Sequence, residues 1–171
     1  DHNQQSMYFT HKSMTDDGRF LVFWAAGDER EKPARGKETH LLDFHTGRIV
    51  KLPGPGGEIP FLDTERDALY FIDGKGVHRF DFLGGNPATP VLVCALPPEL
   101  ADGKVGRYCT HLTLSHDRTK CFLDAELRDS LRNVQGVLDL ATGKWTQWGE
   151  TPFLCNHGQI HPFDAGTALC A

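Results

Sequence analysis

One pattern recurs four times along the chain, and its spacing restricts the fold more than any other feature. Each copy is a short polar turn rich in Asp, followed by an apolar run. Taking Val22, Tyr70, Phe122 and Leu169 as equivalent points, subtraction of the residue numbers gives steps of 48, 52 and 47 residues. A period near fifty residues is typical of the blades of a β-propeller or a related array.

The repeats predict where the blades lie. We expect three blades at about 8–53, 57–97 and 107–149, with a fourth that starts from 156 and is incomplete at residue 171. A propeller ring needs roughly four to eight blades to close and to remove its exposed sheet edges. The fold class that we predict is therefore all-β, with about three and a half blades of a propeller in 1–171. Further chain or a partner chain would supply the rest of the ring.

The apolar runs predict strands. They are continuous rather than alternating, which is typical of strands covered on both faces; they are FLVFW (20–24), ALYFI (68–72), VLVCAL (91–96) and KCFLDA (120–125). Two segments of the form D-x-x-T-G, at 43–47 and 139–143, predict hairpin turns in which Gly supplies the positive φ. No window of the sequence shows a clear helical period.

Charge and cysteine content limit the partners and the compartment. The formal net charge of −5 argues against a nucleic-acid partner, because phosphate-tracking surfaces are basic. We expect no membrane partner, since no apolar stretch approaches the roughly 18 residues of a spanning helix. Among the five cysteines, Cys94, Cys121 and Cys170 fall in apolar runs and are expected to act as small hydrophobes. Reduced thiols predict a cytoplasmic location. Because the sequence begins at Asp1 and not at Met, a periplasmic location stays an alternative.

Histidine and basic residues gather in three segments that enter the innermost strands: 1–15, 106–115 and 153–162. Lys12 and Arg107 could hold a carboxylate, Arg107 in bidentate fashion. The alternative is that both are surface charges and that His111 is a hydrogen-bonded residue in a strand.

The segment 156–161 offers a second interpretation. Alternate residues of a strand share a face, so His157, Gln159 and His161 would point the same way. Imidazole and amide oxygen are suitable ligands for a divalent ion. The spacing matches no specific metal signature, which favours the alternative that His157 only forms hydrogen bonds. Similarly, Trp145 and Trp148 could form a sugar platform, but packing between blades is favoured.

Three stretches, MYFTHKSMTDDGRFLVF (7–23), GRYCTHLTLSHDRTKCFLDAE (106–126) and NHGQIHPFDAGTALCA (156–171), resemble the oligogalacturonate lyase family of seven-bladed propeller enzymes. The resemblance implies β-elimination on pectin-derived acidic oligosaccharides with the help of manganese. In that family the metal ligands, the catalytic arginine and the catalytic histidine lie in later blades. The resemblance therefore assigns no catalytic and no metal-ligating residue to this chain, and it leaves seven candidates for the wall of a substrate pocket: His2, Tyr8, Lys12, Arg107, His111, His157 and Gln159.

Three functions stay open at this point. The chain forms the N-terminal half of an oligogalacturonate lyase-like enzyme and is inactive by itself, or it belongs to a non-catalytic propeller that binds or scaffolds. The third is a lyase of the same fold that acts on another acidic sugar.

Overall fold

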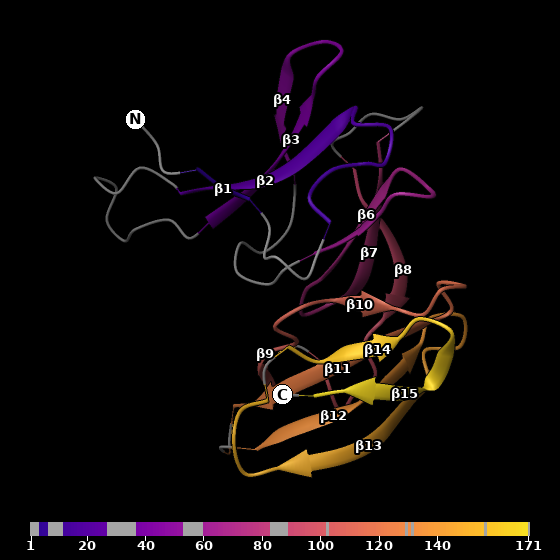
Figure 1. Ribbon diagram of the computed structural model, residues 1–171. Helices are drawn as coiled ribbons and strands as arrows, with labels where there is room; N and C mark the ends of the chain where they lie inside the picture. Colours follow the sequence, from indigo (N-terminus) through magenta and orange to yellow (C-terminus); the bar gives the residue numbers. More distant parts are fainter. Residues whose placement is uncertain are drawn as a thin grey trace. The chain divides into compact units, whose positions relative to one another are not determined.

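The computed structural model describes residues 4–6, 12–26, 37–52, 60–82, 89–101, 103–128, 130, 132–155 and 157–170. His2 and Tyr8 lie outside the described residues. The described part is all-β, with fifteen strands in four sheets and no helix, and the chain is a partial β-propeller (Figure 1). No helix that could span a membrane occurs in these ranges.

Four sheets follow one another along the chain. The first contains β1 (Gln4–Ser6), β2 (Phe20–Ala26), β3 (Lys37–Asp43) and β4 (Arg48–Lys51), in that order. The second contains β5 (Phe61–Asp63), β6 (Ala68–Ile72), β7 (Gly76–Asp81) and β8 (Val91–Ala95), in that order.

The third sheet has the order β10 (Thr113–Leu114), β11 (Lys120–Leu127), β12 (Asn133–Asp139) and β13 (Trp145–Thr151), and β9 (Val105–Arg107) also pairs with β11. The fourth is a hairpin of β14 (Gln159–His161) and β15 (Asp164–Leu169). Pairings in the first, third and fourth sheets are antiparallel. The simple up-and-down order within each sheet is that of a propeller blade.

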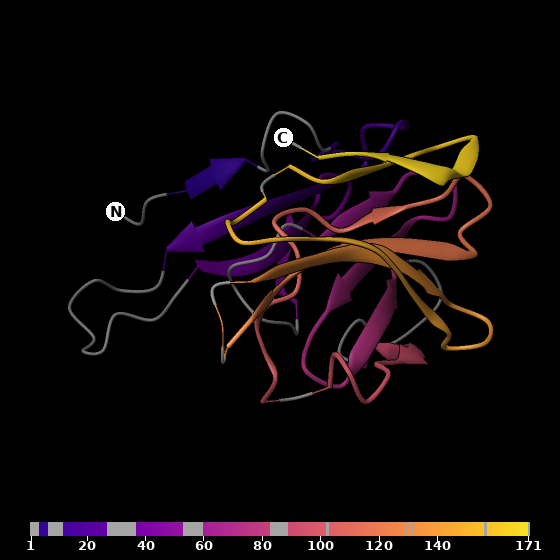
Figure 2. The same ribbon diagram turned by 90° about the horizontal axis from the view of Figure 1, so that it is seen from below.

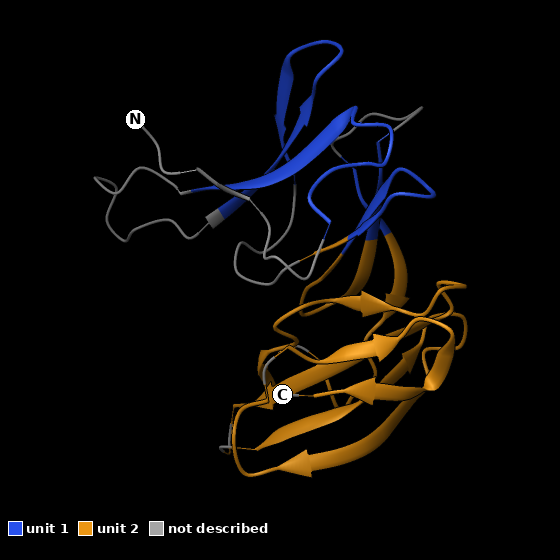
Figure 3. Cartoon of the chain, in the orientation of Figure 1, with its two compact units in different colours: residues 1–57, 62–70, 79–91 blue, residues 58–61, 71–78, 92–171 orange. Residues whose placement is uncertain are grey.

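The chain divides into two compact units (Figure 3). Unit 1 comprises Asp1–Gly57, Leu62–Tyr70 and Arg79–Val91; unit 2 comprises Glu58–Phe61, Phe71–His78 and Leu92–Ala171. In unit 1 an aromatic cluster is formed by Phe20, Phe80 and Phe82, with ring centroids 5.3 Å apart for Phe20–Phe82 and 5.9 Å for Phe80–Phe82. All three rings are buried.

The repeated polar turn has the same hydrogen bonds in the first and third sheets. Thr15 Oγ1 donates to Asp17 Oδ1 at 2.6 Å, and the Phe20 N–H donates back to Thr15 Oγ1 at 3.0 Å. Ser115 Oγ donates to Asp117 Oδ1 at 2.7 Å, and the Lys120 N–H donates back to Ser115 Oγ at 3.0 Å. Hydroxyl and carboxylate thus cap the start of β2 and β11 in the same way, which gives the sequence repeat a local cause.

The predicted D-x-x-T-G turns are present as well. Gly47 and Gly143 have φ values of 69° and 71°, and the N–H of each donates to the Asp carbonyl oxygen that opens its turn, at 2.8 Å in both. These turns connect β3 to β4 and β12 to β13.

The core of unit 2 joins the third sheet to the last hairpin. Phe122, Val137 and Ile160 are buried together, and Ala165 and Ala168 pack against them. Figures 1 and 2 show the β14–β15 hairpin beside β10 and β11, and residue contacts join β14 to both strands. Burial of such side chains contributes about 1.5–3 kcal/mol each for the larger ones.

Two expectations about burial are wrong. All of β6 is buried, but in β8 Val91 is 54% and Leu92 49% exposed, because β8 is the last strand of its sheet and β7 is its one neighbour among the described strands. Cys94 and Cys121 are buried as expected, whereas Cys170 is exposed, since it follows the last residue of β15.

Candidate functional site

Two segments of unit 2 that carry predicted site residues meet in the structure. One follows β9 and contains His111; the other precedes β14 and contains His157 (Figure 1). The ring of His111 stacks on the ring of His157, with centroids 5.1 Å apart and an interplanar angle of 28°. His111 is only 1% exposed and His157 is half-buried. The structure thus brings together two of the histidines that the sequence predicted.

Arg107 joins the same two segments. Its guanidinium donates to Thr110 Oγ1 at 2.5 Å and to the Cys155 carbonyl oxygen at 3.2 Å, and its Nε lies 3.8 Å from the Glu126 carboxylate. The side chain is 26% exposed. Through these contacts the guanidinium connects the segment that contains His111 to the segment that contains His157. A ligand carboxylate would have to share the guanidinium with these protein partners.

Asp124 is the residue that the sequence analysis missed. It lies on β11, is 1% exposed, and accepts the Thr110 N–H on Oδ1 at 3.0 Å. Oδ2 has no hydrogen-bond partner among the described residues. A Cβ on Gly158 would stand 3.3 Å from Oδ2, so the backbone of the second segment lies against this carboxylate. One sequence signal could have found it: an acid between Leu123 and Ala125 in an otherwise apolar run.

Burial controls the charge of Asp124. Desolvation raises its pKa from 3.8 to about 6, and the Thr110 N–H, the Arg107 guanidinium and the nearby Gly158 N–H oppose that rise. The Gly158 N–H lowers the pKa of Asp124 because it lies near the carboxylate, although it does not form a hydrogen bond of ordinary geometry with Oδ2. A buried acid that titrates near neutral pH is typical of functional sites, though structural ion pairs also produce such shifts.

The proposed common face of His157, Gln159 and His161 is absent. β14 begins at Gln159, His157 has a left-handed φ of 58°, and the register shifts between Ile160 and His161. The strand alternation on which that expectation depended therefore does not run through the three residues. Gln159 is half-buried and His161 is exposed.

No three His, Cys, Asp or Glu side chains in the described ranges are grouped in a way that could hold a metal ion. These residues therefore do not fit a manganese site.

Lys12 belongs to unit 1. Its Nζ lies 2.7 Å from Asp16 Oδ1 and 3.4 Å from Thr64 Oγ1, and its side chain is 60% exposed. This is an exposed ion pair within one turn of the chain, of the kind that contributes little to stability. Its role as a carboxylate ligand stays a prediction, as do those of His2 and Tyr8.

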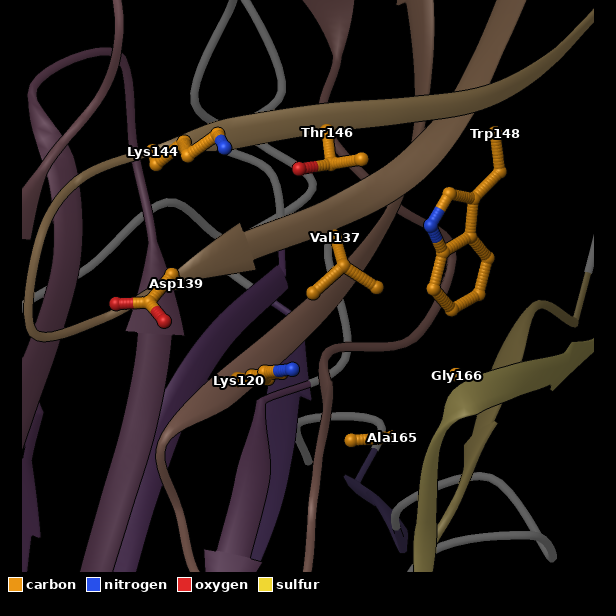
Figure 4. Close-up of a pocket in the computed structure, with 8 residues that line it drawn as sticks. All are labelled: Lys120, Val137, Asp139, Lys144, Thr146, Trp148, Ala165 and Gly166. Atoms are coloured by element: carbon orange, nitrogen blue, oxygen red, sulfur yellow. The ribbon is translucent and has the colours of Figure 1, made fainter.

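A hollow of about 330 Å³ lies elsewhere on unit 2 (Figure 4), lined by Lys120, Val137, Asp139, Lys144, Thr146, Trp148, Ala165 and Gly166. Trp148 is 41% exposed, and its ring lies 5.9 Å from that of Phe122 in the core. The Asp139 carboxylate is occupied by the turn that follows β12, where it accepts the Thr142 N–H and hydroxyl. The hollow continues the packing between the third sheet and the last hairpin, and nothing in it singles out a ligand.

No protein-family model and no curated protein sequence matches the chain. Among solved structures, oligogalacturonate lyase from Vibrio parahaemolyticus is similar at 19% identity and a TM-score of 0.71, over 98% of this chain and 46% of that one. An oligogalacturonate lyase solved in complex with manganese is similar at 22% identity and a TM-score of 0.69, over 98% and 46%. The Cps50 (Swd1) β-propeller domain from Myceliophteria thermophila gives 13% identity and a TM-score of 0.54, over 94% and 45%.

At these identities the likenesses establish the fold. The chain spans 46% of the length of the two lyases and has the propeller fold that they share.

Proposed function

We propose that this chain forms the N-terminal blades of a lyase that cleaves pectin-derived oligogalacturonides by β-elimination. The observation that carries the proposal is the similarity of 98% of the chain to two oligogalacturonate lyases at TM-scores of 0.71 and 0.69. The family-like stretches 7–23, 106–126 and 156–171 support it independently of the structure. Further chain or a partner chain completes the ring in this proposal.

In the proposed reaction a base takes the proton from C5 of a galacturonate unit, and the bond from C4 to the leaving oxygen breaks. The electron pair of the C5–H bond forms the C4–C5 double bond, and the leaving sugar takes up a proton. The negative charge that develops beside the uronate carboxylate needs positive charge or hydrogen-bond donors near it. Arg107 would supply such charge to the pocket wall through space while it remains joined to Cys155 and Glu126.

Manganese, which the resemblance implies, would strengthen that electrostatic help when bound. The resemblance implies that its ligands and the catalytic base lie in later blades, and the described residues of this chain do not fit a metal site. The part of the chain in unit 2 contributes a wall formed by His111, His157 and Arg107, with Gln159 as the neighbouring residue.

The test is incubation of the protein that carries these 171 residues, at its full length, with digalacturonate and manganese. We expect ultraviolet absorbance from the new C4–C5 double bond, and its loss when the metal is removed by a chelator. A folded protein that produces no such absorbance would remove the proposal.

Two other functions remain candidates. The similarity to the Cps50 (Swd1) domain supports a non-catalytic propeller as an alternative, because it shows that the chain is also similar to a propeller domain that is not one of the lyases. It predicts that calorimetry detects a bound partner or sugar without turnover. A lyase for another acidic sugar predicts double-bond formation from oligosaccharides of glucuronate or mannuronate and none from digalacturonate.

A further inference from the structure

The buried carboxylate of Asp124 is not explained by the stability of the fold. A charged group that is removed from water costs free energy unless it is paired and hydrogen-bonded on all sides. Only Oδ1 has a hydrogen-bond partner in the described structure, and Oδ2 has none. Asparagine would fill the same space and still accept the Thr110 N–H, without a charge. The acid therefore needs a reason other than packing.

The contacts of Asp124 give such a reason, because they reach both segments that carry the stacked histidines. Thr110, which donates to Oδ1, directly precedes His111. Gly158, whose backbone lies against Oδ2, directly follows His157. The strand β11 thus presents one carboxylate to the two backbones that fix the positions of the two rings.

A side chain at Gly158 would collide with this arrangement. A Cβ there would stand 2.6 Å from Phe122 Cε1 and 3.3 Å from Asp124 Oδ2. Only glycine allows the second segment to approach β11 closely enough for its N–H to influence the carboxylate. The left-handed φ of His157, 58°, is a further sign that the tertiary contacts hold this segment in its path.

We propose that Asp124 is a positioning residue that holds the His111 and His157 segments in one arrangement and thereby sets how tightly the site binds an acidic sugar. This inference rests on the proposed function for its ligand. Asp124 acts through the two backbones and the histidine pair, not by contact with the sugar.

Several titratable or charged groups surround Asp124 and must be included in any account of its ionisation. Arg107 on β9 lowers its pKa, and Glu126 lies two residues further along β11 as a partner of Arg107. Cys170, which follows β15, interacts electrostatically with Asp124, and His157 and Cys155 lie in the segment that precedes β14. Burial of the sulfur, and then the charges of Cys155 and Asp124, raise the pKa of Cys170 to about 11, although the residue as a whole is exposed.

The activity test compares wild type with Asp124→Asn, which keeps the shape and removes the charge, and with Glu99→Gln as a control. Glu99 is an exposed acid of the same unit, outside the site. We expect Asp124→Asn to raise KM for digalacturonate on the order of tenfold, with kcat changed less than about twofold. The inflection near pH 6 in kcat/KM should disappear, and Glu99→Gln should match wild type.

A second measurement does not depend on turnover. In wild type the backbone amide proton signals of Thr110 and Gly158 should shift with a midpoint near pH 6, and they should not do so in Asp124→Asn. Amide signals that stay constant in wild type from about pH 4 to pH 8 would overturn the proposal. So would an unchanged KM in Asp124→Asn, or a raised KM together with a lower melting temperature, since a weakened fold would then explain it.

If the wild-type protein neither cleaves nor binds any uronate, the proposed function fails on its own. The titration of Thr110 and Gly158 then decides alone whether Asp124 joins the two segments.

Discussion

Two acids lie at the ends of the segment 117–124, which runs from the turn before β11 into the strand, and they are in opposite environments. Asp117, in the turn before β11, accepts hydrogen bonds from the Ser115 hydroxyl and from the Thr119 N–H and hydroxyl, which lower its pKa to about 2. Asp124, further along the strand, is buried, and desolvation raises its pKa to about 6.

The difference separates fold from site. The Asp117 arrangement is repeated at Asp17 in the first sheet, so it belongs to the architecture of a blade. No acid stands in the corresponding place of the apolar run in the first sheet, where Trp24 occupies the position 100 residues before Asp124. Asp124 is thus an addition to the repeat, and an addition that costs stability is evidence for a function.

The largest expected effect comes from removing that added charge. The folded protein keeps the proton on Asp124 up to about pH 6, whereas an unfolded chain releases it near 3.8. The folded state therefore binds more protons between these values, and stability falls as pH rises from about 4 to about 6 and is constant above. Asp124→Asn should remove this fall and raise the free energy of unfolding at pH 8 by up to about 3 kcal/mol.

Urea unfolding of wild type and Asp124→Asn at pH 4 and at pH 8 measures this effect, with Glu99→Gln as the control for loss of a surface charge. A variant that is less stable than wild type at pH 8 would mean that the ionised carboxylate stabilises the fold. The contrast between Asp117 and Asp124 would then disappear.

The next effect concerns the close approach at Gly158. Gly158→Ala places a Cβ 2.6 Å from Phe122 Cε1, and Phe122 is 1% exposed in the core and cannot move aside. We expect a loss of about 1–3 kcal/mol from overpacking. The matched control is Gly106→Ala, where the nearest atoms stand 3.7 Å and 3.8 Å away, and a change within about 0.5 kcal/mol is expected.

Thermal unfolding of the two variants side by side checks this prediction. Equal melting temperatures would show that the second segment can withdraw from β11, and that Asp124 does not need glycine beside it.

The same contrast explains what the sequence could predict. The polar turns and the D-x-x-T-G turns depend on hydrogen bonds within a few residues, such as Thr15 to Asp17 and Gly143 to Asp139, so their residue types reveal them. The propeller fold followed from their spacing. The arrangement around Asp124 depends on Thr110, 14 residues earlier, and on Gly158 beyond the next two strands, which no local pattern encodes.

The errors have the same origin. The expected alternation through His157 and His161 is wrong because a left-handed residue and a register shift interrupt it, and residue types alone predict neither. The expected burial of β8 is wrong because an apolar sequence does not distinguish an edge strand from a central one.

The smallest expected effect lies in the turn before β11. Ser115→Ala removes the hydroxyl that donates to Asp117 and accepts from the Lys120 N–H, and Ser115 is buried at 2% exposure. A lost hydrogen-bonded group of this kind costs about 1 kcal/mol. Ser115→Thr is the matched control, because Thr15 makes the same bonds in the first sheet and the substitution should change stability little.

The free energy of unfolding, measured below about pH 4, provides a second check of the Ser115→Ala prediction. The pKa of Asp117 is depressed in the folded state, so its contribution is present above pH 3.8 and is lost as pH falls toward about 2. Ser115→Ala removes the Ser115 hydrogen bond, which is the largest cause of the lowered pKa of Asp117. The free energy of unfolding should then decrease less as pH falls from 3.8 toward about 2. Its decrease between pH 4 and pH 6, which comes from Asp124, should stay unchanged. If Ser115→Ala instead changes the decrease in stability between pH 4 and pH 6, Asp117 and Asp124 are coupled through the strand, and the separation of fold from site would have to be abandoned.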